Sequence, residues 1–393
     1  MRELKSYPII AIVKPTKNCN LRCVYCYEKL EFSIMDEKTL ENSISKVIRY
    51  NDKIAEENSF DKAVSHFIFH GGEPLLLKKE FFEKVICIEN KYARSEVHSV
   101  QNAIQTNLTL LTLDLWRFFK KTGFRLSSSL DGNSKLNDRT RICKDGSGTF
   151  EKIMHSINIA RPNTDAKSPI GCISILTKEK LSKIAEIYHF FKENNISFEI
   201  NPPAITGNAE KNRIKVEVTP EEWGNAMVEL FDIWFHDQTK PFIEIPFLSR
   251  VAAGFLSGRI NSCTFGGTCR NRYISINPNG DVFPCGKFSA GDTFKLGNIN
   301  EHSVTQIIQS STNRYLLTRN AETIEGCKSC DFKEICKGGC FYNAFLETGD
   351  PLKKDSLCKG YKIIYSHIKK VLREEQKKAP SIFSHMKASI MNN

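Results

Sequence analysis

The chain has 393 residues, of which 40% are hydrophobic and 26% charged, and its formal net charge at pH 7 is +11. This length predicts two or three domains with a sizeable core. No apolar run approaches the roughly 20 residues that span a bilayer, and the first residues lack the apolar segment of a signal peptide. We therefore expect a cytoplasmic protein with no membrane partner. The positive charge is compatible with a solvated basic face over residues 353–378, an acidic leader peptide or nucleic acid.

Short apolar strands alternate with amphipathic helices over the first two hundred residues. Repeated βα units of this kind predict an α/β fold with a parallel sheet. A partial (β/α)6 barrel of the TIM type fits best and would place the chemistry at the carboxyl ends of the strands. A doubly wound open sheet fits the pattern less well. The predicted strands are 8–13, 65–69, 99–105, 125–130, 170–176 and 197–201, and the predicted helices are 36–48, 79–89, 113–121, 151–160, 181–193 and 220–235.

The chain contains 14 cysteines, an unusual number for a compartment that keeps thiols reduced. Such an abundance favours metal ligation over disulfides. Eleven of the cysteines fall in two groups, within residues 19–26 and 263–358. Of the others, Cys87 lies in an apolar segment with a helical pattern and Cys172 in one with a strand pattern. We predict that both are buried thiols.

The first cysteine group is Cys19, Cys23 and Cys26, spaced C-x3-C-x2-C in the loop after the first strand. Three thiolates on one short loop suit three irons of a [4Fe–4S] cluster and leave the fourth iron open to a small molecule. A zinc ion would need a fourth ligand nearby, and none is obvious. With Tyr25 just before the last cysteine, the pattern resembles the signature of the radical S-adenosylmethionine (SAM) superfamily.

A second element, Gly71-Gly72-Glu73-Pro74, follows the second strand and resembles the GGEP element of that superfamily. Glycines let the backbone approach a ligand closely. The resemblance implies that this element binds SAM, with Glu73 accepting hydrogen bonds from the methionyl ammonium group.

Further matches lie at the ends of later strands. By the resemblance Arg141 binds the SAM carboxylate with Ser129 as its hydroxyl partner, and Tyr25 lies beside the adenine. Arg139 competes for the same role, and a solvated surface is the alternative for both arginines. The remaining SAM contacts that we predict are Asn107 and Asp131.

Eight cysteines form the second group, the number that closes two cubane clusters with four ligands each. A zinc knuckle is the alternative for its C-x2-C-x5-C part alone. The whole series resembles the SPASM domain, which follows radical SAM cores in enzymes that modify peptides and proteins. The turn at 277–280 between two strand-like runs predicts a hairpin that brings cysteines together. The resemblance assigns Cys263, Cys269, Cys285 and Cys340 to auxiliary cluster I and Cys327, Cys330, Cys336 and Cys358 to auxiliary cluster II.

The sequence pattern and the resemblance together divide the chain into four regions. A radical SAM core at 1–205 is followed by a bridging helical region at 206–259, a SPASM domain at 260–372 and a weakly ordered tail at 373–393. It implies SAM and three [4Fe–4S] clusters as cofactors. Reductive cleavage of SAM would yield a 5′-deoxyadenosyl radical, with electrons from a donor such as flavodoxin or ferredoxin.

The expected function is oxidative modification of a ribosomally made precursor peptide, with a side-chain cross-link preferred over epimerisation. Anaerobic sulfatase-maturating enzymes share the cysteine spacing, but they carry an aspartate as general base where this chain has Gly286. Asp281 and Tyr273 are the candidates for a base from elsewhere. The non-enzyme alternative is an iron–sulfur redox protein that binds nucleic acid. It leaves the GGEP element and Arg141 unexplained, and no nucleic-acid module is visible.

Overall fold

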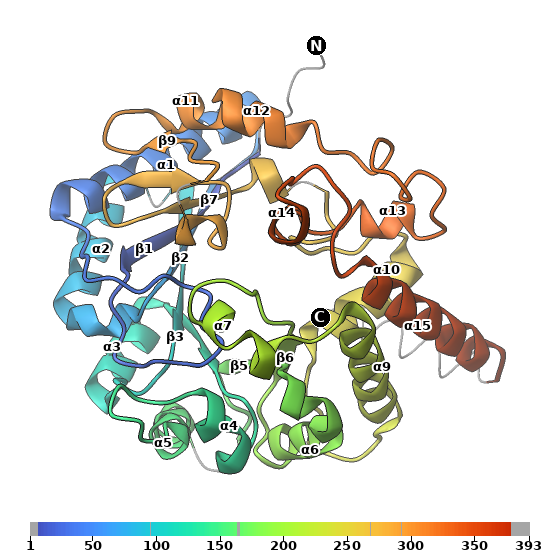
Figure 1. The fold of residues 1–393 in the computed structure, drawn as a ribbon. Helices are drawn as coiled ribbons and strands as arrows, with labels where there is room; N and C mark the ends of the chain where they lie inside the picture. Colours follow the sequence, from blue (N-terminus) through green and yellow to red (C-terminus); the bar gives the residue numbers. More distant parts are fainter. Residues whose placement is uncertain (1–6, 95, 163–165, 268, 292, 379–393) are drawn as a thin grey trace.

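The computed structural model of the chain describes residues 7–94, 96–162, 166–267, 269–291 and 293–378. In it, one nine-stranded sheet runs in the order β6-β5-β4-β3-β2-β1-β7-β8-β9 (Figure 1). The first six strands are all parallel, and each pairs with the next along the chain. These strands are β1 (Ile10–Thr16), β2 (Ala63–Gly71), β3 (His98–Thr106), β4 (Arg125–Ser129), β5 (Gly171–Ile175) and β6 (Phe198–Asn201).

Because the strand order follows the chain, every crossover advances in one direction and the helices collect on the outer face. Figure 1 shows them around the outside of the curved sheet. Within the described sheet β6 is an edge strand, so the barrel is not closed. The α/β partial barrel is therefore confirmed, and the reversing strand order of a doubly wound sheet is absent from the described strands. The outer helices are α1 (Glu37–Glu57), α2 (Lys78–Tyr92), α3 (Leu113–Thr122), α5 (Phe150–Ala160) and α6 (Ile184–Glu193).

Local sequence explains where these helices begin and which faces they bury. The Asp36 side chain caps α1 by accepting a hydrogen bond from the Thr39 backbone N–H at 2.7 Å. In α2 the buried side chains are Phe82, Val85 and Glu89. Cys87 lies on the other face of α2 and is exposed, so the prediction that it is buried was wrong, whereas Cys172 is buried in β5 as predicted.

Several short helices between the predicted elements have too few residues to show a periodic pattern. They include two that follow β6, at the start of the predicted bridging region. These are α4 (Ser134–Thr140), α7 (Asn208–Lys211), α8 (Arg213–Val216), η1 (Pro74–Leu77) and η2 (Lys178–Lys183).

The cysteine-rich part continues the same sheet. The predicted hairpin is present as β7 (Tyr273–Ile276) and β8 (Asp281–Phe283), with β9 (Gly297–Asn298) beside it. β7 also pairs in parallel with β1, a contact between distant parts of the chain that no local pattern signals. The remaining elements are α9 (Pro220–His236), α10 (Pro246–Ser257), η3 (Cys269–Asn271), η4 (Phe288–Ala290), α11 (Val304–Ile308), α12 (Ser311–Leu317), α13 (Lys333–Cys336), α14 (Phe341–Thr348) and α15 (Cys358–Lys378).

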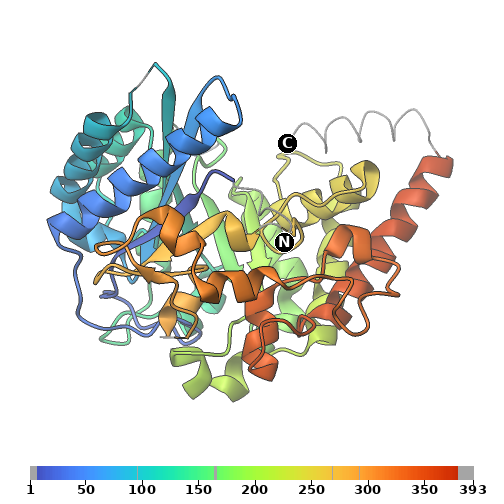
Figure 2. The same cartoon turned by 90° about the horizontal axis from the view of Figure 1, so that it is seen from above.

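The long C-terminal helix α15 packs on α9, on the side of the molecule opposite α1 and α2 (Figures 1 and 2). Residues 373–378 of the predicted tail belong to this helix, and residues 379–393 lie outside the described part of the chain. No helix within the described residues has the length and apolar character needed to cross a bilayer.

The contact between α9 and α15 depends on two glycines. A Cβ added to Gly224 would stand 2.8 Å from the Gly360 Cα, and one added to Gly360 would stand 2.3 Å from the Pro220 carbonyl oxygen. We predict that Gly360→Ala forces the helices apart, costs about 1–3 kcal/mol and lowers the thermal midpoint. Gly291→Ala is the matched control, because its added Cβ meets no atom within 4 Å. Equal midpoints for the two variants would contradict the prediction.

Candidate functional site

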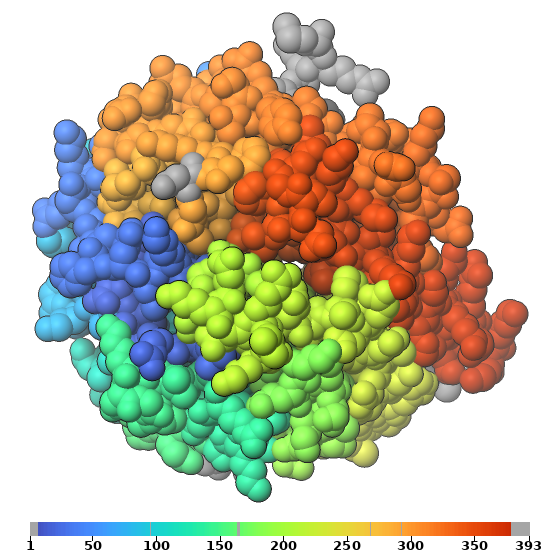
Figure 3. Space-filling view, viewed as in Figure 1, coloured from blue at the N-terminus to red at the C-terminus, as the bar shows by residue number. Residues whose placement is uncertain are grey.

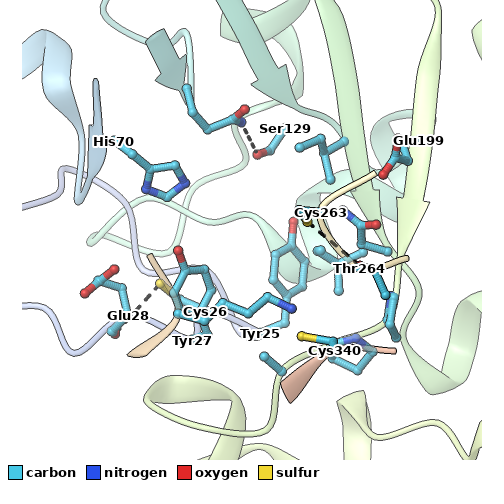
Figure 4. A pocket seen from close by; sticks show the side chains of 18 of the residues that line it. Tyr25, Cys26, Tyr27, Glu28, His70, Ser129, Glu199, Cys263, Thr264 and Cys340 are labelled. Carbon is cyan, nitrogen blue, oxygen red and sulfur yellow. Dashed lines mark hydrogen bonds between the residues drawn. The ribbon is translucent and has the colours of Figure 1, made fainter. Parts of the chain in front are cut away.

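A cavity of about 690 Å3 lies where the carboxyl ends of the parallel strands meet the cysteine-rich part (Figure 4). Residues from the ends of β2 to β6 line one side, including Gln105, Ser129 and Glu199. The other side includes residues from the second cysteine group. Thiols of both groups therefore face one space, and the lining cysteines are Cys19, Cys23, Cys26, Cys263 and Cys340.

Backbone hydrogen bonds hold the first cysteine loop in place. The N–H groups of Arg22 and Val24 donate to the carbonyls of Ile142 and Thr140, both at 2.8 Å. From the other side, Asn208 in α7 donates through its backbone N–H to the Cys26 carbonyl, also at 2.8 Å. Figure 3 shows this yellow-green segment beside the blue N-terminal part of the chain.

The thiols of this loop are buried, and burial sets their protonation. It raises the pKa of Cys19 to about 11 and that of Cys26 to about 12. Thiols with such pKa values remain protonated near neutral pH, and a metal that binds them must displace the protons. Without a bound metal, these thiols would therefore be poor nucleophiles at neutral pH.

The two glycines of GGEP are needed where β2 ends against the start of the cysteine loop. Gly71 has φ +121°, and a Cβ there would lie 2.3 Å from the Thr16 carbonyl oxygen. A Cβ on Gly72 would lie 2.0 Å from the Asn18 carbonyl oxygen. Both glycines also line the cavity. Glycine is therefore required at both positions because they lie against protein backbone. The sequence had suggested close approach to a ligand as the reason.

Both carboxylate oxygens of Glu73 accept hydrogen bonds from the protein. Its carboxylate accepts hydrogen bonds from the Thr106 hydroxyl (2.6 Å) and from the backbone N–H groups of Asn107 (2.7 Å) and Leu75 (2.9 Å). Neither Glu73 nor Pro74 is among the cavity-lining residues. The contact of Glu73 with the SAM ammonium group stays a prediction, and the observed contacts tie the ends of β2 and β3 together.

Asn107 connects the end of β3 to the cysteine loop. Its side-chain amide donates to the Asn20 Oδ1 at 2.9 Å and lies 3.9 Å from the Cys19 sulfur. The Asn107 side chain also accepts a hydrogen bond from the Thr109 hydroxyl at 2.7 Å. Asn20 and Thr109 were not singled out in the sequence, because polar loop residues there show no distinguishing pattern.

The structure places the two candidate arginines in different environments. Arg141 is buried at the cavity wall, where its Nη1 donates to the Tyr25 hydroxyl at 3.0 Å. Its buried Nε has no hydrogen-bond partner among the described residues. Arg139 is exposed and paired with Glu179 at 3.2 Å. The Ser129 hydroxyl lines the cavity but accepts its hydrogen bond from Gln105 at 3.3 Å.

Asp131 lies behind this wall in a buried ion pair with Lys180, at 2.8 Å. It also accepts a hydrogen bond from the Thr140 hydroxyl at 2.6 Å. Burial raises the pKa of Asp131, but Lys180 and Arg141 outweigh it and hold the pKa below its usual value. The Lys180 Nζ lies 5.5 Å from the centre of the Tyr25 ring. Asp131 therefore supports the cavity wall through Lys180 and does not itself line the cavity.

The auxiliary cysteines fall into two neighbourhoods. Burial raises the pKa of Cys269, and the charges of Cys340, Cys263 and Cys285 raise it further. Burial likewise raises the pKa values of Cys336 and Cys358, and the charge of Cys327 raises both further. The assignment of the eight cysteines to two sets of four stays a prediction. All fourteen cysteines are free of disulfides. In the described part of the chain, no three His, Cys, Asp or Glu side chains lie close enough to hold a single metal ion.

Comparison with known families gives the identity of both cysteine regions. Residues 13–191 match the radical SAM superfamily, and residues 263–331 match the SPASM iron–sulfur cluster-binding domain. The chain is a radical SAM protein with a SPASM domain. SAM and iron–sulfur clusters are therefore its cofactors, and it is an enzyme.

Individual relatives of this radical SAM protein cover almost its whole length. The cysteine-type anaerobic sulfatase-maturating enzyme of Clostridium perfringens is 26% identical over 92% of this chain and 96% of the relative. The serine-type enzyme of Bacteroides thetaiotaomicron is 29% identical over 92% and 89%.

Two solved structures share the fold. Native anSMEcpe with bound AdoMet and the Kp18Cys peptide has a TM-score of 0.80 at 23% identity, covering 94% of this chain and 100% of that one. SuiB of Streptococcus suis bound to the precursor peptide SuiA has a TM-score of 0.61 at 19% identity, covering 90% and 76%.

The radical SAM protein departs from the expected sulfatase-maturase pattern at Gly286. Lack of room for a side chain does not explain this departure. A Cβ there would meet the Ile12 side chain at 3.5 Å, an ordinary contact. Of the two alternative bases, Tyr273 lines the cavity. Asp281 does not, and it is paired with Lys295 at 2.6 Å.

Sequence reasoning missed a buried pair beside the cavity, Lys14 and Glu28. The Lys14 Nζ donates to Glu28 at 2.5 Å and to the Gly286 carbonyl at 2.8 Å. The available signal was the position of Lys14 in the first strand, two residues after Ile12 and on the same face. His70 is also in the lining, and burial together with Lys14 lowers its pKa to about 3, so its ring stays neutral.

We predict that Lys180→Met destabilises the radical SAM protein by about 3–5 kcal/mol, because it leaves Asp131 as a buried charge without its partner. The thermal midpoint of the purified protein measures the effect. Lys183→Met is the control, since Lys183 forms an exposed pair with Glu186. If both variants lower the midpoint equally, the buried pair does not support the wall as described.

Proposed function

We propose that this radical SAM enzyme oxidises a side chain of a ribosomally made peptide, with a cross-link as the product. The observation that carries the proposal is the single cavity lined by thiols of both cysteine groups. When bound, SAM and its reduced cluster supply a hydrogen-atom acceptor, and the auxiliary clusters supply an electron acceptor. A substrate in that cavity would lie within reach of both.

The residues of the cavity fit the cofactors. Cys19, Cys23 and Cys26 would hold the core cluster and leave one iron free for SAM. Arg141 would bind the SAM carboxylate through its unpartnered Nε, while Tyr25 fixes the orientation of its guanidinium. The eight later cysteines would hold auxiliary clusters I and II in the two sets given above. The four-region division of the chain remains part of this proposal, as does a flavodoxin or ferredoxin as electron donor.

The similar proteins support a peptide substrate. The Clostridium and Bacteroides relatives are sulfatase-maturating enzymes, and both structural neighbours hold peptides. Cross-linking is preferred because Gly286 lacks the carboxylate expected of sulfatase maturases. Formylglycine formation is the second candidate, since the similarity to those enzymes extends over nearly the whole chain.

The decisive experiment is anaerobic turnover of the reconstituted enzyme with SAM, dithionite and the short peptide encoded beside its gene, in D2O. We expect the peptide to lose two hydrogens, with fragmentation blocked between two residues. A mass change confined to one Ser or Cys would instead indicate formylglycine. Uptake of one deuterium without oxidation would indicate epimerisation. Formation of 5′-deoxyadenosine with an unchanged peptide would refute the peptide substrate.

A second prediction tests the arginine assignment. Arg141→Lys keeps the charge but loses the planar fork, so we expect the Kd for SAM to rise roughly tenfold or more. Arg139→Lys is the matched control and is expected to bind SAM as the unchanged protein does. Equilibrium binding of SAM to reconstituted, unreduced enzyme measures both. An effect of Arg139→Lys equal to that of Arg141→Lys would refute the assignment.

A further inference from the structure

Glu28 lines the cavity and has one carboxylate oxygen without a hydrogen-bond partner among the described residues. The residue is 3% exposed, and its Oε2 accepts a hydrogen bond from the Lys14 Nζ at 2.5 Å. Its other oxygen, Oε1, is buried and has no hydrogen-bond partner among the described residues. Glu28 lines the cavity close to Cys26 and Tyr27, as Figure 4 shows.

An unpaired buried polar atom at a cavity wall indicates a group that a ligand can satisfy, because such atoms in native proteins nearly always have partners. Three described lining residues carry one: Glu28 at Oε1, Arg141 at Nε and Trp223 at Nε1. The Arg141 and Trp223 atoms are donors, and Arg141 is already assigned to the SAM carboxylate. Glu28 supplies the one acceptor in this set, so its ligand must bring a donor.

The position of Glu28 relates it to the missing carboxylate at residue 286. Lys14 bridges the two sites, since its Nζ binds both Glu28 and the Gly286 carbonyl oxygen. The Gly286 carbonyl also accepts a hydrogen bond from the Ser289 hydroxyl at 2.8 Å. One lysine therefore holds the carboxylate of Glu28 beside the segment in which sulfatase maturases place theirs.

The charges around Glu28 indicate which kind of substrate group can bind to its carboxylate. Lys14 already neutralises the carboxylate, and Lys287 also lines the cavity. A cationic substrate group would place a second positive charge next to Lys14, and the single Glu28 carboxylate does not balance two cations. A neutral O–H, S–H or N–H donor satisfies Oε1 without changing the local charge.

We propose that Glu28 is a substrate-binding residue: its Oε1 accepts a hydrogen bond from a neutral donor on the peptide residue that is modified. This inference rests on the proposed function, because it assumes a peptide in the cavity. It adds the chemical class of the residue that the peptide must place there, and it assigns Lys14 as the residue that positions Glu28.

The test compares Glu28→Gln with the unchanged enzyme. Lys14 can only donate, so Gln must turn its carbonyl to Lys14 and its NH2 to the cavity. The substitution thus keeps the shape of the side chain and replaces the acceptor with a donor. We expect the Kd of the peptide, measured by calorimetry on SAM-loaded, unreduced enzyme, to rise roughly tenfold or more. The Kd for SAM and the iron content should stay the same.

Glu31→Gln is the control, because Glu31 is a half-exposed residue of the same loop and pairs with Lys17 at 3.0 Å. A second measurement avoids enzyme variants altogether. A peptide whose modified residue lacks the donor, such as Ala for Ser or Phe for Tyr, should bind the unchanged enzyme with the same roughly tenfold loss. That peptide should lose little further affinity for Glu28→Gln.

Peptide affinity that is equal in both enzymes, or equal for both peptides, would overturn the inference. So would a loss of SAM affinity in Glu28→Gln, because Glu28 would then serve the cofactor. Turnover by the unchanged enzyme separates the two levels of the proposal. If that enzyme leaves the peptide unmodified, the proposed function fails and the inference falls with it. If it modifies the peptide and Glu28→Gln binds that peptide normally, the inference alone fails.

Discussion

The site depends on one contact that has no room for a side chain. Gly71 and Gly72, where β2 ends, meet the backbone of residues 16–18, where β1 leads into the first cysteine loop. This contact fixes the distance between the two strand ends. Glu73 then joins the end of β2 to β3, and Asn107 reaches from β3 back to Cys19. A short chain of backbone contacts and buried hydrogen bonds thus sets where the first three thiols stand.

Charged groups around the cavity are arranged in pairs that leave selected atoms free. Asp131 and Lys180 neutralise each other behind Tyr25, and Lys14 and Glu28 do so beside Cys26. Buried charges of this kind are tolerated because each has a partner, and the partner also fixes its orientation. Arg141 and Glu28, which line the cavity, each keep one buried polar atom without a partner among the described residues. Such an arrangement favours binding of a particular ligand geometry over adaptability.

The sequence allowed the fold to be predicted where periodicity is strong. The six barrel strands, the helices between them and the hairpin around residues 277–280 follow from alternation, amphipathic spacing and turn residues. Local patterns could not reveal the pairing of β1 with β7, because it joins residues more than 250 positions apart. The cysteines and Arg141 were visible as motifs. Lys180 and Glu28 were not, since their importance comes from burial, and an isolated Lys or Glu in a sequence is normally exposed.

The pairing of β1 with β7 has a consequence for the solubility of the protein. In a barrel that does not close, a first strand without a second neighbour would present a row of free backbone N–H and C=O groups, a template for association with other chains. β7 covers that row, and the short strands β8 and β9 follow it outward. The cysteine-rich part thus protects the exposed side of the barrel sheet from aggregation, in addition to any role in electron transfer. Chain segments ending before residue 273 would lack this protection.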